Sequence, residues 1–211
     1  MKALGLITEY NPMHFGHTYH IRQSQALTKP DVTVAVMSGS VVQRGDFAMH
    51  SKFKRTKTAL HNGVDLVIEI PSFFVMQAAD YFAEAGVYLL DQLGVSHLVF
   101  GSESGEIKDL KALQALQESP DYETSLKAAL ADGMSYPDAA YQATQKAHIN
   151  ATLTPNNILG VSYLKAIKKM GSPMHADTIK REKRTYYDAL KTFQKIQSAT
   201  AIRTELKQGK S

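Results

Sequence analysis

Apolar runs that alternate with helical stretches constrain the fold of this chain more than any other feature of its sequence. Four short runs are rich in Val and Ile and nearly continuously apolar, as in strands that are buried on both faces: Ala3–Ile7, Val32–Met37, Asp65–Ile70 and Ser96–Phe100. Helical patterns separate these runs at 17–28, 51–62 and 77–93. The alternation predicts an α/β fold with a doubly wound parallel sheet and right-handed crossovers. In such sheets, ligands bind at the carboxyl ends of the strands.

The second half of the chain adds mostly helices. Residues 106–150 are expected to be all-helical, with breaks at Pro120 and near Gly133–Pro137, and to form a helical insertion or cap on the sheet. Three further elements are expected: a helix over Pro155–Met170 capped by Thr154 or Asn156, a strand over Met174–Ile179 and a last helix over Ser198–Lys207. We therefore expect a single catalytic domain over residues 1–211.

Composition excludes several classes of protein. The chain contains no cysteine, which excludes disulfides, thiolate metal sites and a cysteine nucleophile. No apolar run approaches the roughly 18 residues that a membrane span needs, so no membrane partner is expected. The sequence begins directly with a strand and shows no pattern of a secretory signal. A cytoplasmic protein fits these observations.

Charge is unevenly distributed along the chain. Residues 1–160 carry 12 Lys+Arg against 16 Asp+Glu, whereas residues 161–211 carry 12 Lys+Arg against 4 Asp+Glu. The asymmetry suggests a contact with a polyanion near the C-terminal end. A solvated basic helix face explains the same charge equally well.

The residues most suggestive of chemistry follow the first strand. His14 and His17, with Gly16 between them, lie where that strand passes into a helix. A helix N-terminus offers unpaired backbone N–H groups and the positive end of a dipole, so phosphates bind there. Glycine lets the backbone approach a phosphate closely, and the histidines can donate hydrogen bonds to a phosphoryl group as charge builds on it. The alternative is that the two histidines only cap a turn, and the lone His20 and His50 are expected to be structural or on the surface.

Two further segments carry phosphate-binding features. In the segment Ile196–Arg203, hydroxyl residues precede a predicted helix and Arg203 lies one turn into it. These residues form either a simple helix cap or a site for the β- and γ-phosphates. The Ser38-Gly39-Ser40 turn ends the second strand and precedes a basic stretch. That stretch can stabilise pyrophosphate, contact RNA or form a solvated helix face, and it contains Lys52, Lys54, Arg55 and Lys57.

Together these motifs resemble known enzymes. His-x-Gly-His and the late Ser-Ala-Thr-x-Ile-Arg are similar to the two signatures of the nucleotidyltransferase superfamily. Segments in the same order along the whole chain resemble the bacterial tRNA(Met) cytidine acetate ligase family: 9–17, 37–39, 42–46, 62–71, 100–103, 155–160, 179–181 and 198–203. Ser40 and Gln197 depart from the family pattern, in which Asn and Ser are expected. Members of the family are longer than this chain, so their C-terminal tRNA-binding part is expected to be absent here.

The resemblance implies a Rossmann-like fold of the nucleotidyltransferase type and a two-step activity. The enzyme would activate acetate with ATP as acetyl-adenylate and then acetylate N4 of the wobble cytidine in elongator tRNA(Met). Mg²⁺ would arrive with the nucleotide. The catalytic residues carried over by position are His14, His17, Ser198, Thr200 and Arg203. The ATP contacts carried over are Ile7, Thr8, Glu9, Tyr10, Asn11, Pro12, Met13, His14, Phe15, Gly16, His17, Thr18, Tyr19, His20, Gly101, Asn156 and Arg181.

Two other functions fit the same residues. An adenylyltransferase acting on a small cofactor precursor would use both phosphate motifs and need no RNA partner. A truncated fragment that binds ATP or RNA without turnover is the third possibility. The acyl specificity and the oligomeric state do not follow from the sequence.

Overall fold

A sheet of five strands lies at the centre of the computed structural model, which describes residues 1–43, 45–145 and 152–181. The strands are β1 (Ala3–Thr8), β2 (Val32–Ser38), β3 (Leu66–Ile70), β4 (His97–Ser102) and β5 (His175–Lys180). Their order is β3-β2-β1-β4-β5 and every pairing is parallel, which confirms the predicted doubly wound sheet. All five carboxyl ends therefore meet at one edge. The strand order reverses between β1 and β4, which is where ligands bind in sheets of this type.

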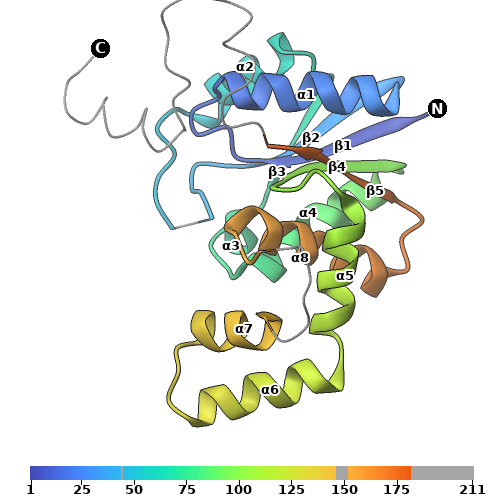
Figure 1. Cartoon of the computed structure of the whole chain (residues 1–211). Coiled ribbons are helices and arrows are strands. Elements are labelled where there is room, and N and C mark those ends of the chain that lie inside the picture. The colour runs from blue at the N-terminus through green and yellow to red at the C-terminus, as the bar shows by residue number, and fades with distance from the viewer. Residues whose placement is uncertain (44, 146–151, 182–211) are drawn as a thin grey trace, which may run out of the picture.

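Helices cover both faces of the sheet (Figure 1). The helices α1 (Phe15–Thr28) and α2 (Lys52–His61) lie on one face, and α4 (Ala79–Gln92) and α8 (Pro155–Met170) lie on the other. Successive residues of a strand point to opposite faces. Leu4 and Leu6 of β1 accordingly pack in a cluster with Ile21 of α1, whereas Ile7 contacts Gly86 of α4. Burial on both faces explains why the strand sequences are nearly continuously apolar.

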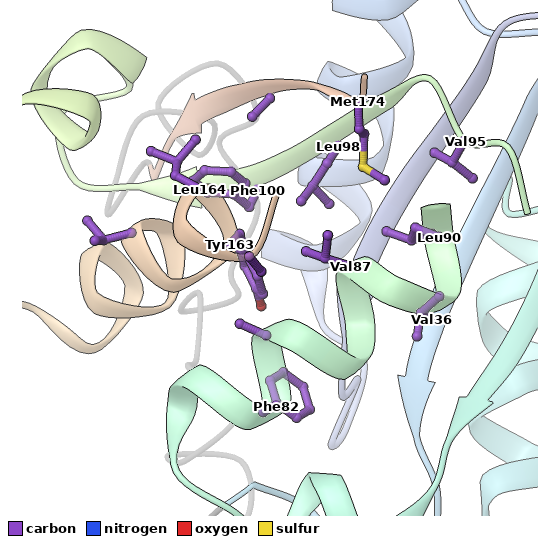
Figure 2. Close-up of a cluster of buried hydrophobic side chains, with 14 of the residues drawn as sticks. Val36, Phe82, Val87, Leu90, Val95, Leu98, Phe100, Tyr163, Leu164 and Met174 are labelled. Carbon is purple, nitrogen blue, oxygen red and sulfur yellow. The ribbon is translucent and has the colours of Figure 1, made fainter. Parts of the chain in front are cut away.

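The larger core lies between the sheet and the helices α4 and α8 (Figure 2). The rings of Phe100 on β4 and Tyr163 on α8 are 5.3 Å apart between centroids. Gly160 permits this close packing, because a Cβ atom there would lie only 2.7 Å from Cε2 of Phe100. The core therefore fixes the N-terminal half of α8 against β4, beside the carboxyl edge of the sheet.

The region 106–150 contains three helices, α5 (Ile107–Gln117), α6 (Pro120–Ala131) and α7 (Tyr136–Gln145). Helix α5 buries Leu110 and Leu113 in the larger core. Helices α6 and α7 pack mainly against each other and lie farther from the sheet (Figure 1). The break predicted at Pro120 is the start of α6, where Ser119 Oγ accepts a hydrogen bond from Tyr122 N. The role of this region as an insertion or cap of the catalytic domain stays a prediction.

The ends of several elements differ from the prediction. Helix α1 begins at Phe15 rather than at residue 17, because His14 caps it. The short helix α3 (Ser72–Val75) was not predicted, and Thr154 rather than Asn156 caps α8. The predicted last helix, Ser198–Lys207, lies outside the described residues. Among the residues that the structure does describe, no helix combines the length and apolar character needed to cross a membrane.

Candidate functional site

The two histidines of the His-x-Gly-His motif form a reciprocal cap at the start of α1. His14 is the N-cap residue, and its Nδ1 accepts a hydrogen bond from the backbone N–H of Gly16 at 3.1 Å. His17 lies three residues later, and its Nδ1 accepts from the backbone N–H of His14 at 3.2 Å. The rings stack with centroids 3.8 Å apart. This is the arrangement of a capping box, with imidazoles in place of the usual hydroxyl and carboxylate.

The cap determines where each imidazole carries its proton. A ring nitrogen that accepts a hydrogen bond is unprotonated, so in the neutral state the proton of both His14 and His17 lies on Nε2. The edge of Tyr10 packs against His17, with ring centroids 5.2 Å apart at an angle of 70°. The motif therefore holds two imidazoles in a fixed orientation and a defined tautomer, each with one N–H available to donate.

Burial keeps these imidazoles neutral. Desolvation, together with the positive charge of Arg181, lowers the pKa of His17 to about 3 and that of His20 to about 4. The pKa of His14 is lowered by the same two causes. Neutral imidazoles can donate from Nε2 without bringing a formal charge to the site. The arrangement suits the stabilisation of charge that develops during a reaction.

The lowered pKa values predict that acid destabilises the fold. The half-buried His17 and His20 stay neutral in the folded state down to about pH 4, whereas the same side chains of the unfolded chain bind protons below about pH 6.5. Their contribution to stability is therefore full above pH 6.5 and falls as the pH drops toward the folded values. Each histidine adds a slope of about 1.4 kcal/mol per pH unit in this window. Urea unfolding between about pH 7 and 5 measures the slope.

The variant His20→Leu provides the comparison for this measurement. It removes one buried imidazole and leaves the capping pair in place, so its slope should be smaller than that of the unaltered chain by about 1.4 kcal/mol per pH unit. An identical slope in both proteins would contradict the assignment of His20 as a neutral buried group.

The backbone at the start of α1 differs from the prediction. The sequence predicts unpaired N–H groups there, but the N–H groups of His14 and Gly16 are paired with the two imidazoles. Glycine at position 16 leaves room for this ring, because a Cβ atom there would lie 3.0 Å from Cε1 of His14. The donors presented by this turn are therefore the imidazole Nε2–H groups, since the imidazoles occupy these two amides.

Arg181 lies at the same edge of the sheet, directly after β5. Its backbone N–H donates to the carbonyl oxygen of Ser102, and its side chain crosses Gly101, where a Cβ atom would lie 3.1 Å from Cγ of Arg181. Within the described residues, the guanidinium of Arg181 forms no ion pair. It is close enough to His14 and His17 to lower the pKa of both. The end of β5 therefore places a cation over the end of β4, near the two imidazoles.

The start of α8 is joined to the turn after β4. Asn156 Nδ2 donates to Glu103 Oε1 at 3.2 Å, and Asn157 Oδ1 accepts from the backbone N–H of Glu103 at 3.2 Å. Asn157 is buried and also donates to the carbonyl oxygen of Thr152. The sequence prediction missed the structural role of Asn157, although its position in the first turn of a helix is a signal for such contacts.

A buried arginine anchors the loop between β1 and α1. Arg55 is 1% exposed and donates to the carbonyl oxygens of Glu9, Gly39 and His50. Burial lowers the pKa of the guanidinium, and the carboxylates of Glu9 and Glu69 oppose that shift. The sequence interpretation placed Arg55 in a basic stretch that stabilises pyrophosphate, contacts RNA or forms a solvated helix face. For Arg55 each of these is wrong, because its guanidinium is buried and donates to backbone carbonyls and to Ser38 Oγ. The four-residue spacing of buried Arg55 and Ala59 on α2 is the signal that was available.

The other predicted nucleotide-loop residues occupy three places. Ile7 and Thr8 end β1, residues 9–13 form the loop, and residues 15–20 form the first turns of α1. Tyr10 is buried with a positive φ of 47°, and buried Asn11 accepts a hydrogen bond from Met49 N. The predicted phosphate residues Ser198, Thr200 and Arg203 lie outside the described residues, so their proximity to the histidines stays a prediction. In the described part of the chain, no three His, Asp or Glu side chains gather as a metal site.

Known proteins are similar to this chain in sequence and in fold. The tRNA(Met) cytidine acetate ligase of Staphylococcus aureus (strain MRSA252) is 45% identical over 98% of this chain and 54% of its own length. Thermotoga maritima TmcAL bound with alpha-thio ATP superposes with a TM-score of 0.86 at 38% identity, covering 99% of this chain and 51% of the other. Its apo form gives a TM-score of 0.87. The chain spans about half the length of these relatives.

A single protein family matches the whole chain, including the histidine cap at the start of α1. The profile that covers residues 1–211 is described as HIGH Nucleotidyl Transferase. Positions 14–17 read His-Phe-Gly-His, and they supply the cap on which the site is built. This chain belongs to the HIGH nucleotidyl transferase family.

Proposed function

We propose that this chain carries the ATP-dependent step of a tRNA(Met) cytidine acetate ligase. The observation that carries the proposal is the 45% identity to such a ligase over 98% of this chain. In the proposed reaction, acetate is activated as acetyl-adenylate, and the acetyl group passes to N4 of the wobble cytidine in elongator tRNA(Met). A tRNA substrate implies action in the cytoplasm.

The residues at the carboxyl edge fit an adenine nucleotide. The imidazoles of His14 and His17 and the guanidinium of Arg181 lie at the carboxyl edge near the switch point between β1 and β4, and all three are donors suited to phosphate oxygens. Gly101 leaves room for the Arg181 side chain. The ATP analogue in Thermotoga maritima TmcAL supports the same assignment. Mg²⁺ carried by the triphosphate would screen its charge.

The chemistry assigns a distinct task to each donor. An acetate oxygen attacks the α-phosphorus, the bond from that phosphorus to the bridging oxygen breaks, and pyrophosphate leaves with the electron pair. Negative charge grows on the phosphoryl oxygens during this step, and His14 and His17 donate hydrogen bonds to them. Arg181 offsets the repulsion between the anionic reactants. In the second step the cytidine amino group attacks the acetyl carbon, loses a proton, and AMP leaves.

Exchange of radiolabelled pyrophosphate into ATP tests the first step, because it needs neither tRNA nor the second step. We expect exchange that depends on acetate. Exchange that requires a different acceptor in place of acetate would instead identify an adenylyltransferase acting on a small precursor. ATP-induced thermal stabilisation without any exchange would identify a chain that binds nucleotide without turnover, as the half-length match to the relatives allows.

A further inference from the structure

Three exposed phenylalanines lie in segments that follow the carboxyl ends of β2 and β3, at the edge of the sheet that carries the site described above. Phe47 precedes α2, Phe53 lies in its first turn, and Phe73 follows β3 in α3; their exposed fractions are 84%, 76% and 66%. Large apolar side chains that form an exposed patch are typical of interaction sites. The strands β2 and β3 that lead into these segments are paired in the sheet, from Val34 with Leu66 to Ser38 with Ile70.

The structure links this region to the predicted nucleotide loop. Phe47 pairs with Val41 in a short bridge, and two residues later the backbone N–H of Met49 donates to Asn11 Oδ1 at 2.7 Å. At the other end, Lys52 forms an ion pair with Glu69 of β3 at 2.6 Å. The exposed rings therefore lie on a framework that is continuous with the loop carrying His14.

Unpaired positive charge follows Phe53 along α2. Lys54 and Lys57 are exposed on α2 and form no ion pair within the described part of the chain. Neither α1 nor α2 contains an aspartate or a glutamate. Lys52 differs, since its ammonium is already held by Glu69. The combination favours a partner that carries negative charge and planar apolar groups at once.

We propose that Phe47, Phe53, Phe73, Lys54 and Lys57 form an aromatic–lysine surface that binds single-stranded RNA. Unstacked bases would lie on the phenyl rings, and the ammonium groups would contact the phosphates between them. The inference rests on the proposed function, in which a nucleobase of an RNA loop must reach the carboxyl edge. A protein partner could pack against the same apolar side chains, but such packing would not explain why Lys54 and Lys57 form no ion pair in the described part of the chain.

Binding of a short labelled RNA hairpin that carries the anticodon loop tests the proposal by fluorescence anisotropy at low salt. Phe47→Ala and Phe53→Ala should each weaken binding on the order of tenfold. Tyr141→Ala, which removes an aromatic ring that is 55% exposed on α7, is the matched control and should leave binding unchanged. The same stem closed as a duplex without a loop should bind weakly, and the phenylalanine variants should not change that binding.

Two further variants separate RNA from a protein partner. Phe53→Tyr keeps a ring for stacking and should retain binding, whereas Phe53→Leu keeps apolar area and should behave like Phe53→Ala. The double variant Lys54→Ala/Lys57→Ala should reduce the slope of log affinity against log salt by roughly 0.7 per lysine, with exposed Lys111→Ala on α5 as control.

Several outcomes overturn the proposal. They are no binding of the hairpin by the unaltered chain, equal losses in Phe53→Ala and Tyr141→Ala, or full binding by Phe53→Leu, which would indicate general apolar docking. Acetate-dependent pyrophosphate exchange by the unaltered chain is measured separately. If exchange is present and the surface variants leave the affinity for RNA unchanged, only this proposal fails. If the variants reduce RNA binding as expected and exchange is absent, only the proposed function fails.

Discussion

Replacing His17 with Gln should reduce acetate-dependent pyrophosphate exchange by on the order of a hundredfold or more while leaving the fold stable. Glutamine at the third helical position can accept the N–H of His14 through its side-chain oxygen, as in an ordinary capping box. It therefore keeps the cap and removes the imidazole Nε2–H. The exchange rate at saturating ATP and acetate measures the loss.

Two other variants separate catalysis from capping. His17→Ala removes both the donor and the cap, so it should lose the same activity and also about 1 kcal/mol of stability. His175→Ala, at an exposed histidine on the amino end of β5, should change neither. Exchange near the normal rate in His17→Gln would show that the imidazole at position 17 only caps the helix.

Replacing Arg55 with Ala should lower the free energy of unfolding by about 3–5 kcal/mol, because it leaves several buried carbonyl groups without a donor. These acceptors belong to three separate segments: Glu9 in the loop after β1, Gly39 in the turn after β2 and His50, two residues before α2. Urea unfolding followed by circular dichroism measures the change. The same loss should raise the ATP concentration needed for exchange, since the loop leading to His14 would lose its anchor.

The neighbouring Lys54 is the matched control for Arg55. Lys54→Ala removes an exposed cation from the same helix turn and should change stability by no more than about 0.5 kcal/mol. Arg55→Lys should recover only part of the loss, because an ammonium cannot reproduce the planar fork of the guanidinium. Equal stability of Arg55→Ala and Lys54→Ala would contradict the anchoring role.

The strands of the sheet could be predicted because their burial on both faces leaves a continuous apolar pattern. Helix α8 was also predictable, since Pro155 marks its first turn and Gly171 its end. The start of α1 was not, because histidine is not a typical cap residue and the capping depends on a ring conformation that a sequence does not specify. The short helix α3 carries no periodic pattern that four residues could reveal.

Some residues of the candidate site could likewise be placed from the sequence, and others could not. The positions of His14, Gly101 and Arg181 at one edge follow from the parallel direction of the strands, which the alternation of strands and helices predicts. The anchoring role of Arg55 does not, because the sequence places it among lysines of the same charge and gives no sign of the carbonyl groups around it. Long-range contacts of this kind require the folded backbone.

The reciprocal cap has a consequence for how the motif can vary. Each residue advances about 100° around an α-helix, so one inserted or deleted residue between positions 14 and 17 would rotate the second ring away from the first by that angle. The mutual lock of the two rings would then be lost even with both histidines retained. The interval in the tetrad is thus set by helical pitch, and a length change there should be more damaging than a change of the intervening Phe15.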